Sequence, residues 1–79
     1  MEGAQMKSIT DVQKSVSAKI KEFKNKEKMT YRDLSEITGI HPDSIRGWTY
    51  CNNAPSLYSA YLLSSAMGMS LDELIHEQV

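Results

Sequence analysis

Two charged residues, Asp43 and Arg46, stand three positions apart near the middle of the chain. The guanidinium of Arg46 can donate to guanine or to a phosphate, and the carboxylate of Asp43 can accept from the amino group of cytosine. Residues three apart on a helix are neighbours, so the two charges can instead neutralise one another. This stretch therefore offers either a surface that reads bases or a balanced ion pair.

Catalytic chemistry finds no support in the sequence. There is no phosphate-binding glycine loop, no nucleophile elbow and no cluster of His, Cys and acidic residues at ligand spacing. His41 and Cys51 lie ten residues apart, on opposite ends of a predicted helix, which is too far for a nucleophile and its base. We therefore predict that the protein is not an enzyme and uses no cofactor or metal.

Two short helices joined by a tight glycine turn are predicted between residues 30 and 50. Thr30 and Asp33 have the spacing of a capping box, which begins the first helix. Gly39 supplies the left-handed conformation that ends it. A second helix should then run from about residue 42 to residue 50. Together these elements predict a helix-turn-helix.

The second helix determines which side chains point outward. His41 can cap it, and Pro42 suits its first turn because the missing N–H would be unpaired there anyway. If Ile45 and Trp48 are buried, a rotation of roughly 100° per residue identifies the outward side chains. They are Asp43, Arg46, Gly47 and Tyr50.

Three more helices complete a predicted all-α fold, a five-helix orthogonal bundle. The first runs over about residues 11–26, after a disordered tail at residues 1–9. Ser56 caps a helix that Gly68 ends, and Ser70 opens a last short helix. The domain as a whole covers residues 10–79.

The core is expected to form from apolar residues at helical spacing. Those predicted to face inward, along with one of Ala60 and Tyr61, are Val12, Val16, Ile20, Phe23, Leu34, Ile37, Ile45, Trp48, Leu57, Leu63, Met67, Leu71, Leu74 and Ile75. The first helix also carries lysines, most of which should be solvated: Lys14, Lys19, Lys21, Lys24, Lys26 and Lys28.

A long series of residues falls in one register without a gap: Thr30, Leu34, Ser35, Thr38, Gly39, Ile40, Pro42, Ile45, Pro55, Ser56, Leu57, Gly68, Ser70, Leu71, Asp72, Glu73 and Leu74. In this register the chain resembles the phage-repressor family of helix-turn-helix proteins, also called Cro-like or Xre-like. The resemblance extends over about residues 15–75. It implies a lambda-repressor-like bundle that binds double-stranded DNA.

The resemblance also implies roles for individual positions. Bases would be read by Pro42, Asp43, Arg46 and Gly47, and the DNA backbone would be contacted by Tyr31, Asn52 and Asn53. With their neighbours, the candidate DNA-binding residues are Tyr31, Arg32, His41, Pro42, Asp43, Ser44, Arg46, Gly47, Tyr50, Asn52 and Asn53.

The reading positions depart from the family pattern, which favours Gln, Ser, Asn or Lys as donors to purines. Pro42 and Gly47 have no side-chain donor, and phosphates repel Asp43. Lys24 and Thr49 stand where many relatives have a buried Arg–Glu pair, which they cannot form. These departures weaken the predicted reading surface and leave Arg46 as its strongest candidate.

Cys51 stands where the family usually has a glycine. If the helix ends there with a positive φ, the Cys is strained; otherwise Asn52 or Asn53 adopts that conformation. A single cysteine permits no internal disulfide.

The length, charge and hydropathy of the whole chain limit the possible interpretations. At 79 residues it forms one small domain with a net charge of −1. Residues 1–28 carry seven Lys against four acids, and residues 29–79 carry two Arg against six acids, giving +3 and −4. No apolar run has transmembrane length and the start lacks a signal-peptide core, so a cytoplasmic protein without membrane contact is expected.

Two functional hypotheses remain. The first is a sequence-specific transcriptional regulator, repressor-like and of the phage or mobile-element type, which binds a palindromic operator as a homodimer. The second is a protein-binding module on the same fold, such as an antirepressor, adaptor or inhibitor, with little DNA affinity. The outward face of the helix at residues 42–50 distinguishes them.

Overall fold

Five helices, in the predicted order, make up the part of the chain that the computed structural model describes, residues 9–76. Their bounds are α1 Ile9–Glu27, α2 Tyr31–Thr38, α3 Pro42–Thr49, α4 Leu57–Ala66 and α5 Leu71–Ile75. The structure thus confirms the all-α fold of five helices.

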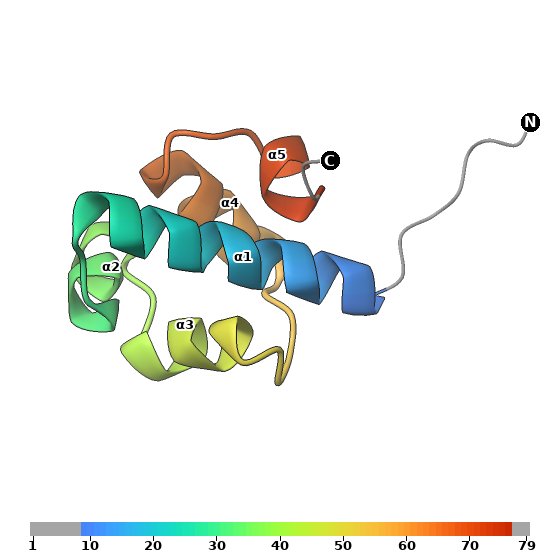
Figure 1. The fold of residues 1–79 in the computed structure, drawn as a ribbon, viewed down its shortest axis with the longest axis horizontal. Coiled ribbons are helices and arrows are strands. Elements are labelled where there is room, and N and C mark those ends of the chain that lie inside the picture. Colours follow the sequence, from blue (N-terminus) through green and yellow to red (C-terminus); the bar gives the residue numbers. More distant parts are fainter. Residues whose placement is uncertain (1–8, 77–79) are drawn as a thin grey trace, which may run out of the picture.

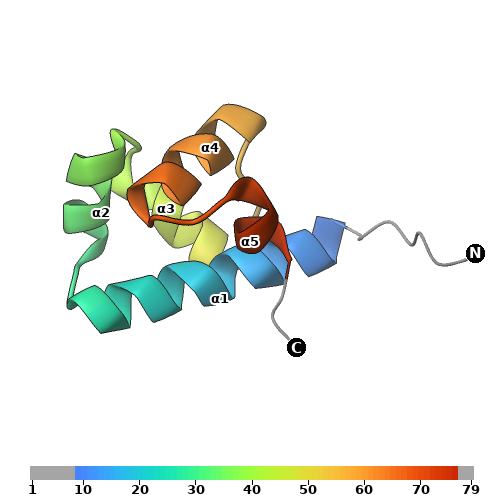
Figure 2. The ribbon, with the colours of Figure 1, turned by 90° about the horizontal axis from the view of Figure 1, so that it is seen from above.

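α1 spans the long dimension of the molecule, and the shorter helices gather along it (Figure 1). It packs against α3 on one side and α5 on another, while α2 contacts α3 and α4, and α4 contacts α5. Viewed at right angles, α3, α4 and α5 lie over one side of α1, and α2 stands beside the end of α1 that precedes it (Figure 2). None of the helices within residues 9–76 is long and apolar enough to cross a membrane.

The start of α1 differs from the prediction. Ile9 already belongs to the helix, so Thr10 lies in its first turn, and the helix begins earlier than predicted. The rest of the predicted tail, residues 1–8, falls outside the described residues, as do residues 77–79.

The predicted capping signals set the ends of the short helices. At α2, Thr30 Oγ1 accepts from the Asp33 N–H at 3.1 Å, and the Asp33 carboxylate accepts from the Thr30 N–H at 3.0 Å. The same reciprocal pair occurs at α5, between Ser70 and Glu73. Gly39 ends α2 with a φ of 77°, in the left-handed region. These local interactions determine where α2 and α5 begin, and Gly39 starts the turn that joins α2 to α3.

The core confirms most of the predicted apolar positions. Its buried members are Val16, Ile20, Leu34, Ile40, Ile45, Trp48, Ala60, Leu63, Met67 and Leu74. Partly buried side chains that pack against them include Val12, Phe23, Leu71 and Ile75. Ala60, and not Tyr61, therefore faces inward on α4.

Two predicted core residues are exposed. Ile37 has 48% of its surface accessible because the inner face of α2 passes through Leu34 and Thr38, one turn apart. Thr38 tolerates burial because its hydroxyl donates to the Leu34 carbonyl at 2.7 Å. Leu57 is 78% exposed, since α4 begins there, one turn before its first buried residue, Ala60.

Lys19 corrects the expectation of a solvated lysine. Its side chain is buried, and its ammonium donates to the backbone carbonyls of Glu73 and, at 2.9 Å, of His76. A cation suits the unpaired carbonyls at the C-terminus of α5. Ser15 joins the same two helices by donating to the Leu74 carbonyl at 2.9 Å. Lys19 therefore fastens α5 to α1.

Two residues other than glycine have a positive φ within residues 9–76: Lys28 at 55° and Cys51 at 60°. Cys51 itself adopts the conformation that the sequence left open between it and the two following asparagines. Lys28 ends α1, and no glycine marks that turn in the sequence.

Candidate nucleic-acid interface

The outer face of α3 carries most of the candidate DNA-binding residues. In Figure 1, α3 lies along the edge of the molecule, below α1. Its inner face is buried through Ile45, Trp48 and Thr49. The other residues of α3 and its flanks are exposed or partly exposed: His41, Pro42, Asp43, Ser44, Arg46, Gly47 and Tyr50.

His41 caps α3 through a ring nitrogen. Its Nδ1 accepts from the backbone N–H of Asp43 at 3.1 Å. A neutral imidazole that accepts at Nδ1 carries its hydrogen on Nε2. The imidazole is largely exposed, so the structure orients an N–H donor toward the surface at the start of α3.

Arg46 and Asp43 form the ion pair that their spacing allows. Arg46 Nη1 lies 2.8 Å from Asp43 Oδ1, with 45% and 74% of the two side chains accessible. An exposed pair at this spacing contributes only about 0.3–0.5 kcal/mol. Arg46 can therefore exchange this partner for a DNA acceptor at small cost.

Tyr31 links α2 to α3. Its hydroxyl lies 2.9 Å from Thr49 Oγ1, and Thr49 Oγ1 donates its single hydrogen to the Arg46 carbonyl at 2.7 Å. Tyr31 must then be the donor to Thr49. The position expected to contact a phosphate thus has its own hydroxyl hydrogen engaged inside the protein.

The Tyr31 ring also contacts two cations. Lys24 Nζ lies 4.0 Å from the ring centroid, and Arg46 Cζ lies 5.1 Å from it. Both distances are within the range of cation–π attraction. No sequence pattern indicated this cluster, whose members come from α1, α2 and α3. Thr49 and Lys24, at the positions of the family's Arg–Glu pair, interact here with Tyr31 and not with each other.

The loop after α3 folds back over the end of that helix. Asn52 donates its backbone N–H to the Gly47 carbonyl at 3.0 Å. A Cβ placed on Gly47 would lie 3.9 Å from the Asn53 side-chain oxygen, an ordinary contact distance. The fold therefore does not require glycine at position 47, and Asn52 and Asn53 lie beside the exposed face of α3.

Arg32 and Ser44 complete the candidate set. Both are exposed, and neither side chain forms a hydrogen bond or ion pair with another described residue. Among residues 9–76, no group of three His, Cys or acidic side chains could hold a metal ion. The surface offers hydrogen-bond donors and positive charge.

Comparison with known proteins identifies the architecture. No curated protein and no solved structure matches the chain. A helix-turn-helix family model matches residues 20–74, more than half of the chain, and this span contains α2, the turn, α3 and α4. The chain belongs to the helix-turn-helix family of the Cro and Xre type, a family of DNA-binding regulators.

Proposed function

We propose that the protein is a sequence-specific transcriptional regulator of the repressor type, carried by a phage or mobile element, that inserts α3 into the major groove of an operator. The observation that carries this proposal is the accessible outer face of α3. Its strongest donor, Arg46, is held by an exposed ion pair with Asp43 and a contact with the Tyr31 ring. In helix-turn-helix proteins the second helix contacts base edges in the groove.

Arg46 is the proposed base reader. A bidentate contact between an arginine and guanine discriminates against other bases by about 1–3 kcal/mol. The exposed pair with Asp43 is worth less than this discrimination, so losing the pair costs only a small part of the preference for guanine. His41, Tyr31, Arg32, Asn52 and Asn53 flank Arg46 as candidate backbone contacts or supports.

A homodimer is part of the proposal because one such module reads few base pairs alone. α4 contains no charged residue, and it is apolar on two sides. Ala60, Leu63 and Met67 are buried, while Leu57, Tyr58 and Tyr61 on its other side are exposed. An exposed apolar face of this kind supports self-association.

The alternative function is a protein-binding module. The observation that favours it is the lack of side-chain donors at Pro42 and Gly47, two of the four positions that read bases in relatives. Such a protein would use the same exposed surface of α3 to bind a partner and would have little affinity for DNA.

Selection from a random-sequence duplex pool at two salt concentrations tests the proposal. We expect enrichment of a palindromic motif and a steep fall of affinity with salt. Arg46→Ala should weaken binding to that motif by about 1–3 kcal/mol and relax preference at one base pair. Arg32→Ala serves as the comparison variant, because the loss of a contact with the DNA backbone should weaken binding to all sequences equally.

Two results would count against this function. If the parent protein enriches no sequence, the protein-binding alternative gains support, and pull-downs from host cells are the next measurement. If Arg46→Ala selects the same motif with the same affinity as the parent, another residue reads the operator. Circular dichroism of each variant establishes that the helices are intact.

A further inference from the structure

The Tyr31 ring brings together two positive side chains from different helices. Lys24 comes from α1 and Arg46 from α3, with distances of 4.0 Å and 5.1 Å to the ring centroid. Two like charges repel one another, and a neutral ring offsets only part of that repulsion. An arrangement of this kind becomes more favourable when an anion binds beside it.

The two cations differ in their partners. Arg46 has a carboxylate at 2.8 Å, that of Asp43. The Lys24 ammonium has no carboxylate within ion-pair distance and donates no hydrogen bond to any other residue in the described part of the chain. Its ammonium has three N–H donors. Within residues 9–76, Lys24 therefore carries a charge and donors that the protein itself does not satisfy.

Tyr31 keeps the Lys24 ammonium beside the reading helix. The ring is anchored at its far end, because the Tyr31 hydroxyl donates to Thr49 on α3 at 2.9 Å. Thr49 is itself buried, and a second hydrogen bond holds it, since the Ser17 hydroxyl on α1 donates to the Thr49 carbonyl at 2.7 Å. A half-buried aromatic ring fixed in this way restricts where a flexible lysine can extend.

We propose that Lys24 binds a phosphate of the DNA backbone, at the edge of the groove that α3 enters, and that Tyr31 is a positioning residue for this contact. The inference rests on the proposed function and deepens it. The sequence predicted that Tyr31 contacts the DNA backbone. The inference assigns this phosphate contact to Lys24, whose ammonium lies against the Tyr31 ring. A lysine ammonium suits a phosphate because it is a compact point charge with rotatable donors.

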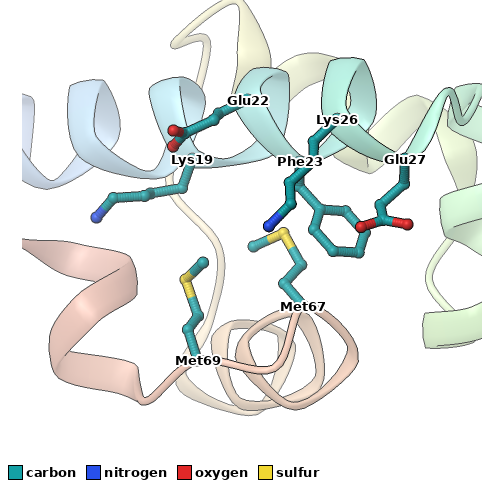
Figure 3. Close-up of a pocket in the computed structure, with 7 residues that line it drawn as sticks. All are labelled: Lys19, Glu22, Phe23, Lys26, Glu27, Met67 and Met69. Carbon is teal, nitrogen blue, oxygen red and sulfur yellow. The ribbon is translucent and has the colours of Figure 1, made fainter.

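Lys26 provides a matched control on the same helix. It lines a cleft of about 260 Å³ between α1 and the turn from α4 to α5, together with Phe23, Met67 and Met69. Figure 3 shows the Lys26 side chain extending into this cleft, toward Met67. Lys24→Met and Lys26→Met remove the same charge from α1, but only the first removes it from the cluster around Tyr31.

The experiment measures binding of the full chain to its selected operator and to a random duplex over a range of salt concentrations. The slope of log affinity against log salt is negative, and Lys24→Met should reduce its magnitude by about 0.9, which corresponds to the loss of one phosphate contact. The loss should be equal for both duplexes, with the selected motif unchanged. Lys26→Met should keep the parent slope. Lys24→Arg should keep it as well, because the positive charge at position 24 remains.

Tyr31 variants test the positioning role. Tyr31→Phe keeps the ring but loses its anchor on Thr49, so the magnitude of the salt slope should fall between those of the parent and Tyr31→Leu. Tyr31→Leu removes the ring and should reduce the magnitude of the slope as Lys24→Met does. In the double variant Tyr31→Leu with Lys24→Met, the two losses should not add, since both remove one contact. Circular dichroism checks the fold of each variant.

The outcomes separate this inference from the proposed function. A parent protein that binds no DNA overturns both. If the parent binds DNA and both Lys24→Met and Lys26→Met keep the parent slope, only the phosphate contact at Lys24 is overturned. Equal losses from the two substitutions would show a general charge effect and would also overturn it.

Discussion

Replacing Cys51 with glycine should stabilise the domain. Cys51 directly follows Tyr50, the C-cap of α3, and has a φ of 60°. For residues with a Cβ, this left-handed conformation costs roughly 1–2 kcal/mol. Glycine removes that cost but lowers stability by about 0.4–1 kcal/mol, because it gives the unfolded chain more freedom. The Cys51 thiol also lies 3.7 Å from the Gln13 carbonyl, a long and weak contact.

With the middle value of each range, the net gain expected for Cys51→Gly is about 0.8 kcal/mol. In a domain of this size, that corresponds to a rise in melting temperature of roughly 2–8 °C. Thermal and urea unfolding followed by circular dichroism at several protein concentrations would measure it. The concentration series is needed because association of the chain would itself raise the apparent stability.

Cys51→Ala is the matched control, since it removes the thiol and keeps the strained conformation. Its stability should stay within about 0.5 kcal/mol of the parent. Lys28→Gly offers an independent comparison, because Lys28 has a φ of 55° at the end of α1. The reasoning is refuted if Cys51→Gly is no more stable than Cys51→Ala.

Two further substitutions test the proposed surfaces. Asp43→Asn should raise affinity for a random duplex about twofold, because Arg46 no longer gives up a pair worth about 0.5 kcal/mol; a fall in affinity with lost preference for a cytosine would instead make Asp43 a base reader. Tyr61→Glu should shift the protein from dimer to monomer in sedimentation experiments, since it places charge on the exposed face of α4. Ile37→Glu, an equivalent change at an exposed residue of α2, should leave the mass unchanged, and a dimeric Tyr61→Glu would contradict the assignment of that face.

The helix boundaries were predictable because their causes lie within a few residues of one another. Thr30 with Asp33, and Ser70 with Glu73, form reciprocal hydrogen bonds across three positions. Gly39 adopts the conformation for which glycine is preferred. Such local signals determine where a helix starts and stops whatever packs around it.

The buried face of a short helix was harder to predict. In α2, Ile37 and Thr38 both lie near the side facing the core, and hydrophobicity alone favours the isoleucine. The structure buries Thr38 because its hydroxyl is satisfied within the helix by the Leu34 carbonyl. A polar residue that can satisfy itself locally is a candidate for burial, and an apolar count misses it.

The cluster around Tyr31 could not have been predicted from spacing. Lys24, Tyr31, Arg46 and Thr49 lie on three helices, and their contacts depend on how α1 and α2 pack against α3. Lys19 illustrates the same limit, since its carbonyl partners lie more than 50 residues away along the chain. Sequence patterns identified lysines on α1 but did not separate those with a structural role from those without a partner.

The net charge of the chain misrepresents the charge beside α3. Residues 29–79 carry −4, yet two of their acids, Asp33 and Glu73, cap helix N-termini, where the helix dipole favours them. Around Tyr31 the balance is different, because Lys24 and Arg46 stand against Asp43 alone in the contacts of that cluster. Folding thus brings one lysine from the basic N-terminal part of the chain to the edge of α3. A domain with a net charge of −1 can in this way present a locally positive surface to DNA.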